Sequence, residues 1–297
     1  FVSSTFKPGD KMYDILVNIQ HGQHTSAEVK LKELIKHGDV DAMFWYAKMT
    51  FGDSIYSAKP AVELFEKSAE LGNPYSALML SPSSYGCLYY KSKCDKKWLD
   101  KAVNFFEKHA KNGDLRSQYF LLKNKGLDNS KDTRGEYIKE IIRFSESHYY
   151  QPLMDYVDSI LTRNREKGVY ESKTTEQYDL AVSLLTIAAN NNYIPAIDRL
   201  AFISYKKNVD EDLVEKGVML GSTGLISYKY NHSENTKTKY FYNALYKKLS
   251  GHYVFDINQP DEYLRLKIDQ DVDSFFKDIK SSIYIDGFTP RTEWVDR

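Results

Sequence analysis

The chain has 297 residues, of which 42% are hydrophobic, and its 41 Lys and Arg residues balance 41 Asp and Glu residues. This composition predicts a folded protein with a sizeable core, and it provides no net charge that would attract nucleic acid or an anionic membrane surface. No stretch approaches the eighteen or more apolar residues that a membrane-spanning helix needs.

Residues 1–27 form an N-terminal segment that precedes the regular pattern. Its start, Phe1 to Ser4, is neither a signal peptide nor an initiator Met, which predicts a trimmed or processed chain. His21 and His24 have the spacing of two zinc ligands on one helix face, but no third ligand is visible nearby. His24 also precedes a helix-start signal, so we expect a capping or exposed role, and neither a metal nor a cofactor.

A repeated phrase dominates the chain after this segment. An apolar helical stripe, a small residue and a glycine recur in residues 61–72 and again in 102–113. Asn192 stands in the glycine slot of a later copy, and Asn is the usual substitute for glycine at a left-handed helix end. One degenerate copy of the phrase precedes this one, and another follows it. The predicted turn positions are Gly38, Gly72, Gly113, His148, Asn192 and Gly224.

Each repeat contains two helical patterns, one ending at the turn position and one starting just after it. After Gly38, the residues Ala42, Trp45, Tyr46 and Met49 lie on one helix face. Two helices joined by a turn form a hairpin of about 35 to 40 residues, which buries its apolar stripe only against neighbouring hairpins. The pattern therefore predicts an all-α solenoid over residues 28–226.

The phrase resembles the Sel-like repeat, a relative of the tetratricopeptide repeat. Its best matches are residues 61–72, 102–113 and 181–196. The resemblance implies a right-handed superhelical solenoid of five to six degenerate units. It also implies a protein partner on the concave face, which the first helix of each unit lines. The Leu-Gly pair usual on that first helix is absent, being Tyr46-Ala47 in the first copy, so the solenoid is expected to be irregular.

Counting from the start of each first helix selects candidate partner-binding residues. Phe44 and Lys48 occupy two outward positions after Gly38, and Tyr119 and Lys123 occupy the same positions after Gly113. In the unit after Asn192 these positions hold Asp198 and Phe202, so the surface changes along its length. An aromatic anchor beside a cation suits a partner with acidic and apolar features. The alternative is that Phe44 and Tyr119 pack between repeats.

Cys87 and Cys94 are the two cysteines of the chain. On one continuous helix they would lie about 10 Å apart along the axis, too far for a disulfide. Gly86 and the polar residues before Cys94 predict a turn between them, which would allow the bond. A disulfide would indicate an oxidising compartment, and two separate thiols are the alternative.

Residues 227–297 are predicted to form a C-terminal helical cap. Helices are expected over residues 237–250 and 261–280, and the acidic run 269–273 is expected on a solvated helix face. Aromatic residues in these helices could close the end of the repeats, as terminal repeats require. The alternative is that they bind the partner. The residues concerned are Tyr240, Phe241, Tyr246, Phe275 and Phe276.

The chain contains none of the short motifs that mark zinc proteases, serine hydrolases, phosphate-binding loops or dinucleotide-binding folds. We therefore expect a non-enzymatic protein that binds another protein, and no nucleic acid. The repeats and the cysteine pair suggest a bacterial periplasmic protein, for example an immunity protein that neutralises a secreted toxin; cytoplasmic location is the alternative.

Three other functions remain open at this stage. One is an envelope scaffold or regulator. Another is glycan or lipid recognition through tyrosine pairs such as Tyr89-Tyr90 and Tyr149-Tyr150. The last is a hydrolase built on scattered carboxylates such as Glu33, Glu63 and Glu136, none of which has a partner at a catalytic spacing.

Overall fold

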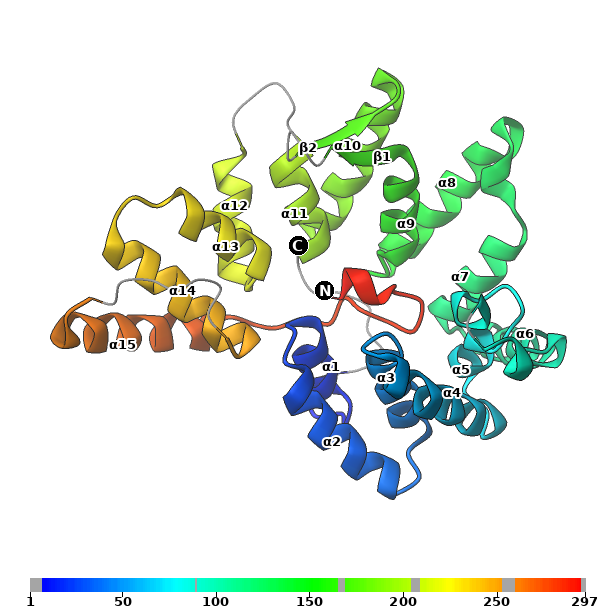
Figure 1. Cartoon of the computed structure of the whole chain (residues 1–297). Helices are drawn as coiled ribbons and strands as arrows, with labels where there is room; N and C mark the ends of the chain where they lie inside the picture. The colour runs from blue at the N-terminus through cyan, green and yellow to red at the C-terminus, as the bar shows by residue number, and fades with distance from the viewer. Residues whose placement is uncertain (1–6, 89, 165–168, 204–208, 253–259, 295–297) are drawn as a thin grey trace. The chain divides into compact units, whose positions relative to one another are not determined.

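The structure, a computed structural model, describes residues 7–88, 90–164, 169–203, 209–252 and 260–294. In these ranges the chain forms fifteen α-helices, four short 3₁₀ helices and one two-stranded hairpin (Figure 1). Most helices that follow one another in sequence pack against each other. The predicted all-α architecture of helical hairpins is confirmed.

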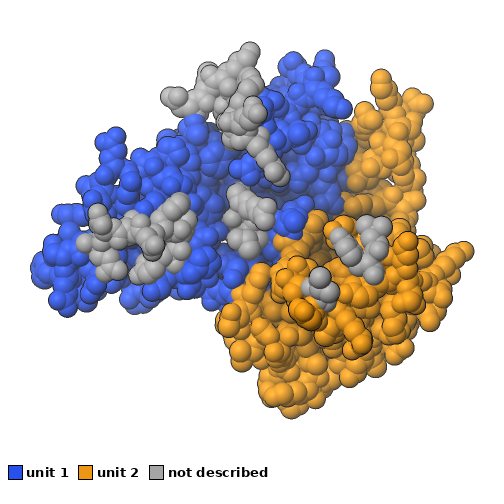
Figure 2. Space-filling view, viewed as in Figure 1, with its two compact units in different colours: residues 1–23, 140–285, 292–297 blue, residues 24–139, 286–291 orange. Residues whose placement is uncertain are grey.

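The chain divides into two compact units (Figure 2). Unit 1 comprises residues 1–23, 140–285 and 292–297, and unit 2 comprises residues 24–139 and 286–291. These limits differ from the predicted segments 1–27, 28–226 and 227–297. One consequence is that a six-residue stretch near the C-terminus belongs to unit 2, while the residues on both sides of it belong to unit 1.

Unit 2 contains the most regular repeats. Its first helices, each following a turn position, are α3 (Val40–Thr50), α5 (Pro74–Met79) and α7 (Leu115–Asn124). Its second helices are α2 (His24–Lys36), α4 (Ile55–Glu70), α6 (Lys96–Lys111) and the first part of α8 (Lys131–Glu146). Short 3₁₀ turns at Tyr85–Leu88, Lys91–Lys93 and Leu127–Asn129 connect these helices.

Unit 1 begins with α1 (Tyr13–Gln20) and continues from the second part of α8. It continues with α9 (Gln151–Ile160), α10 (Thr175–Asn190), α11 (Ile194–Ile203), α12 (Glu211–Leu220) and α13 (Thr223–His232). The predicted C-terminal helices are confirmed as α14 (Thr236–Ser250) and α15 (Glu262–Asp278), which places the acidic run 269–273 on a helix. A last 3₁₀ turn covers Arg291–Glu293.

A β-hairpin interrupts the repeats of unit 1, which the sequence analysis did not predict. Strands β1 (Leu161–Asn164) and β2 (Val169–Ser172) pair antiparallel, with Leu161 opposite Ser172. Arg199 of α11 ties this hairpin to the helices, because its guanidinium lies 4.6 Å from the ring centre of Tyr170 and 3.2 Å from a carboxylate oxygen of Asp158. Arg199 is thus a structural residue of the repeat.

The predicted turn positions mark the helix ends by backbone conformation. Gly38, Gly72 and Gly113 have φ values of 78°, 107° and 88°. His148 and Asn192 have φ values of 59° and 62°, and they are the non-glycine residues with positive φ in the described ranges. A non-glycine residue in the left-handed conformation destabilises the fold by about 1–2 kcal/mol. These two positions therefore show how strongly the repeat requires this turn.

The sixth turn position was placed wrongly. Gly221, with φ 86°, ends α12, whereas Gly224 lies inside α13. The reason is the residue after the turn, because the Ser222 side chain accepts a hydrogen bond from the Leu225 backbone N–H and starts the next helix. Asp39, Asn73 and Asp114 do the same after Gly38, Gly72 and Gly113. A glycine followed by a capping residue is therefore the reliable signal.

Two glycines of unit 2 provide a test of this account. A Cβ atom added to Gly113 or to Gly135 would meet no atom within 4 Å, but Gly113 has positive φ and Gly135 lies inside α8. Gly113→Ala should lower the free energy of unfolding by about 1 kcal/mol because of backbone strain alone. Gly135→Ala should raise it by about 0.5–1 kcal/mol. Urea unfolding of both variants measures the difference, and equal shifts would contradict the account.

Candidate protein-binding site

The first helices of unit 2 present one aromatic surface, which we call the first-helix face and define by α3, α5 and α7. The Tyr75 ring of α5 lies 5.6 Å from the Phe44 ring of α3 and 5.4 Å from the Phe106 ring of α6. Phe106 in turn stacks on Phe120 of α7 at 4.3 Å. These contacts join three consecutive repeats through side chains.

Residues 286–291, with sequence Asp-Gly-Phe-Thr-Pro-Arg, lie on this face. The segment forms a tight turn that its own side chains stabilise. The Asp286 carboxylate accepts hydrogen bonds from the backbone N–H groups of Phe288 and Thr289, at 2.8 and 3.0 Å. The Thr289 hydroxyl accepts one from the Asp286 backbone N–H at 2.9 Å. The turn therefore has a defined shape set by its local sequence.

Phe288 is the anchor of the turn. Its ring stacks nearly parallel on the Phe120 ring, with centres 6.1 Å apart and an interplanar angle of 9°. It meets the edge of the Tyr75 ring at 5.0 Å and packs against Phe106 at 5.5 Å and Tyr119 at 6.4 Å. Offset-stacked and edge-on pairs of this kind contribute about 0.5–1.5 kcal/mol beyond the area they bury.

Gly287 lies so close to the face that no side chain fits there. A Cβ atom at this position would lie 2.4–2.5 Å from three ring carbons of Tyr75, whereas ordinary contacts are 3.4 Å or longer. Tyr75 has little freedom to move, because Phe44, Phe106 and Phe288 surround its ring. Glycine is therefore required for the segment to approach.

Lys48 holds the backbone of the segment. Its ammonium group donates hydrogen bonds to the carbonyl oxygens of Gly287 and Thr289, both at 2.8 Å. The same ammonium lies 5.5 Å from the ring centre of Phe44 and 5.8 Å from that of Trp45. A half-buried cation with these partners is well placed to fix a peptide backbone independently of side-chain sequence.

The charge distribution around the turn is mixed. Arg291 forms an ion pair with Asp53, which follows α3, and both side chains are partly exposed. Burial raises the pKa of Tyr75 well above its ordinary value, and the nearby Asp286 carboxylate raises it further, whereas Arg116 lowers it. Tyr75 therefore stays protonated at neutral pH and offers a neutral ring to the segment.

The predicted partner-binding residues take different places. Phe44 and Tyr119 expose 2% and 1% of their surface, so their rings pack within and between repeats and are not open anchors. Lys48 contacts the segment, and Lys123 is exposed with its ammonium 5.4 Å from the Tyr119 ring centre. Asp198, in unit 1, is buried and accepts a hydrogen bond from Ser222, which is a structural contact. Partner binding by these residues stays a prediction.

Local sequence patterns do not identify the segment as part of the site. Its local signals were an Asp-Gly pair, a Thr and a Pro, which together indicate a turn. The contact with Lys48 spans 239 residues of sequence, so no local pattern could connect the two. Phe288 also stands outside the two helices that were expected in the C-terminal region.

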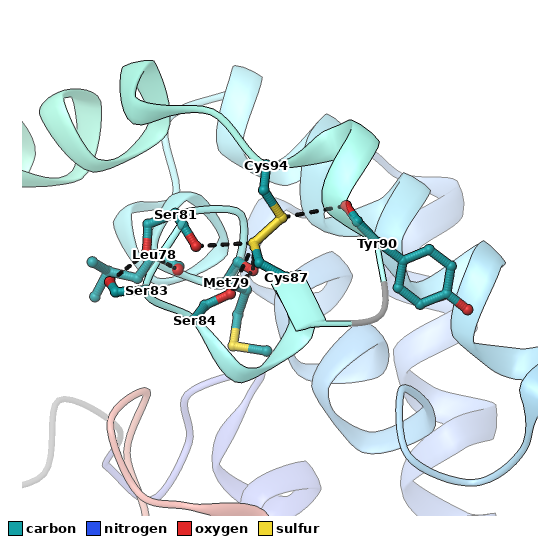
Figure 3. Close-up of a disulfide and its surroundings, with 8 residues drawn as sticks. All are labelled: Leu78, Met79, Ser81, Ser83, Ser84, Cys87, Tyr90 and Cys94. Atoms are coloured by element: carbon teal, nitrogen blue, oxygen red, sulfur yellow. Dashed lines mark hydrogen bonds between the residues drawn. A yellow bond between two sulfur atoms is a disulfide. The ribbon is translucent and has the colours of Figure 1, made fainter.

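Cys87 and Cys94 form a disulfide with their Cα atoms 5.8 Å apart (Figure 3). Two consecutive 3₁₀ turns between α5 and α6 bring them together, as the predicted turn requires. The Ser84 hydroxyl lies 3.2 Å from the Cys87 sulfur and donates to the Met79 carbonyl oxygen. The bond closes the connector between α5 and α6.

Loss of the disulfide is expected to lower the stability of the native state. A closed loop of this length restricts the unfolded chain enough to stabilise the native state by about 2.5 kcal/mol. The double variant Cys87→Ser/Cys94→Ser should therefore unfold at a lower urea concentration than the oxidised wild type. Addition of a reducing agent should shift the wild type and leave the double variant unchanged. A double variant with the same unfolding midpoint as the oxidised wild type would contradict the assignment.

The carboxylates considered for catalysis do not form a site together. Glu33 pairs with Lys36 and His37 on the surface of α2, and Glu63 and Glu136 are exposed on α4 and α8. His21 is buried at the end of α1, and α2 starts at His24. Across the described ranges no three His, Cys, Asp or Glu side chains are grouped to hold a metal ion.

One of the tyrosine pairs considered for glycan binding lies in the core. Tyr149 and Tyr150 are buried, and Tyr150 packs on Tyr193 at 5.0 Å. Tyr89 lies outside the described residues. Within the described part of the chain, no helix is both long enough and apolar enough to cross a bilayer.

Stacked helical hairpins with a chain segment seated on their first helices define a helical-repeat protein. No family model matches the chain, and no curated protein matches it. Among solved structures it is similar to a protective antigen present in uropathogenic Escherichia coli strains, which displays an SLR fold. That match has 13% identity and a TM-score of 0.35, and it covers 94% of this chain and 66% of that chain. The chain thus spans just under two thirds of that antigen's length.

Proposed function

We propose that this protein is a non-enzymatic interaction module whose first-helix face binds an extended or turn-like segment of another protein. The observation that carries the proposal is the seating of residues 286–291 on α3, α5 and α7. There an aromatic anchor, a close-packed glycine and two backbone hydrogen bonds to Lys48 already form the contacts of a peptide complex. Such contacts are those that peptide-binding faces use for anchor and backbone recognition.

The more specific role that we propose is that of a bacterial immunity protein in the periplasm, which neutralises a secreted toxin. The disulfide supports an oxidising compartment, since such bonds persist outside the cytosol. An inhibitor that covers a cleft with a rigid face needs no catalytic group of its own. An envelope scaffold or regulator is the alternative within the same class.

Co-expression with a candidate toxin from a neighbouring gene tests the proposal. The wild type should co-purify with that toxin and restore growth. Lys48→Glu, on the first-helix face, should lower the affinity at least tenfold, because it reverses the charge that holds a peptide backbone. Glu136→Lys, on the outer helix α8, reverses a charge elsewhere and should leave binding unchanged. Absence of any complex, or equal losses in both variants, would contradict the proposed function.

A further inference from the structure

We propose that residues 286–291 are a built-in ligand of the first-helix face, and that the partner presents a turn of the same chemistry, Asp-Gly-Phe-Thr, which displaces them. This inference rests on the proposed function for the existence of a partner. It adds the sequence class of the partner's recognition segment and the competition that controls access to the site.

The turn carries its shape within four residues. Asp286 and Thr289 form hydrogen bonds with each other and with the intervening backbone, so the sequence itself fixes the conformation that the face receives. A partner loop with this sequence needs no help from the rest of its own fold to adopt the same turn. Recognition is therefore transferable to another chain.

Three positions of the turn determine what fits. The first is Gly287, where Tyr75 leaves no room for a Cβ atom. The second is Phe288, which four aromatic rings surround, and a smaller side chain would lose its contacts with those rings. At the third, Thr289, the carbonyl oxygen accepts from Lys48 while the hydroxyl closes the turn.

Two kinds of contact hold the segment on the face: the ring of Phe288 packs among four aromatic rings, and Lys48 donates two hydrogen bonds to the backbone. An ion pair between Arg291 and Asp53, both partly exposed, adds to these contacts. Such an exposed pair contributes little. The attachment of the segment to the rest of the chain supplies a high effective concentration, which a partner in trans must overcome.

The test uses a synthetic nine-residue peptide with the sequence of residues 285–293, labelled with a fluorophore, and anisotropy titration of the full chain. In the Gly287→Ala variant we expect the built-in segment to leave the face, because the added Cβ atom would clash with Tyr75, while the residues of the face are unchanged. We expect this variant to bind the peptide at least tenfold more tightly than the wild type does, since the wild-type face is occupied. A peptide with alanine in the glycine position should not bind either protein.

Two further measurements keep the outcome decisive. The double variant Gly287→Ala/Lys48→Ala should lose peptide binding at least tenfold, because the backbone hydrogen bonds are gone. If Gly287→Ala does not fold by circular dichroism, Phe288→Ala replaces it. If both fail to fold, excess peptide with a photoreactive phenylalanine in place of Phe288 is added to the wild type, and crosslinks to Tyr75, Phe106 or Phe120 are expected.

Absence of binding by a folded Gly287→Ala variant, or absence of crosslinks in the wild type, would overturn the inference. This result is separable from failure of the proposed function, because the titration requires no partner protein. A toxin that binds equally well to wild type and Gly287→Ala, while the peptide does not bind, would support an interaction module and reject the built-in ligand. If the peptide binds but no protein partner is found, the built-in ligand is supported and the proposed function is rejected.

Discussion

Replacement of Gly287 by alanine is expected to release residues 286–291 from the first-helix face and to lower the free energy of unfolding by about 2–3 kcal/mol. The added Cβ atom would lie 2.4 Å from Cδ1 of Tyr75, a ring that Phe44 and Phe106 hold in place. The clash is therefore relieved by departure of the segment, not by movement of the ring. The loss cannot exceed the free energy with which the segment docks.

The matched control is the same substitution where space is open. Gly135→Ala adds a Cβ atom that meets nothing within 4 Å and should stabilise α8 slightly. Hydrogen–deuterium exchange distinguishes release of the segment from general loosening, because release should speed exchange in residues 286–291 and leave α4 protected. A Gly287→Ala variant as stable as the wild type would show that the segment does not need this close approach.

Replacement of Lys48 by alanine is expected to lower the free energy of unfolding by about 2 kcal/mol, because two carbonyl oxygens lose a charged donor at once. Lys123 is the natural comparison, since it stands at the equivalent position four residues after an aromatic side chain, and its ammonium lies 5.4 Å from the Tyr119 ring centre. Lys123 is exposed, so Lys123→Ala should cost less than about 1 kcal/mol.

Urea unfolding of both variants measures this contrast. Equal losses for Lys48→Ala and Lys123→Ala would mean that the cation and ring pair, which the two sites share, accounts for the effect. A larger loss at Lys48 assigns the difference to the backbone hydrogen bonds of the segment. The identical pattern in sequence thus has two different structural meanings.

Local signals explain what the sequence predicted well. The turn positions from Gly38 to Asn192 are properties of one residue and its immediate neighbours, and the backbone conformation confirms them. The error at Gly224 arose because the capping role of Ser222 was not used. The helices α14 and α15 followed from apolar periodicity, which is also local.

The site depended on information that local patterns lack. The outward position of Phe44 was derived from helix geometry alone, whereas the aromatic side chains of α4 and α5 cover it. The β-hairpin consists of two four-residue strands, too short for a clear alternation. Residues 286–291 were assigned to a C-terminal cap, because nothing in their sequence shows that they return to a helix more than two hundred residues earlier.

The most direct test of the central claim, that Lys48 stabilises the protein through the seated segment, is a double-mutant cycle of Lys48→Ala and Gly287→Ala. If Gly287→Ala already removes the segment, Lys48→Ala has no carbonyl left to lose. We therefore expect the free energies of unfolding of the double variant and of Gly287→Ala to agree within about 0.5 kcal/mol. A double variant whose loss equals the sum of the two single losses would contradict it.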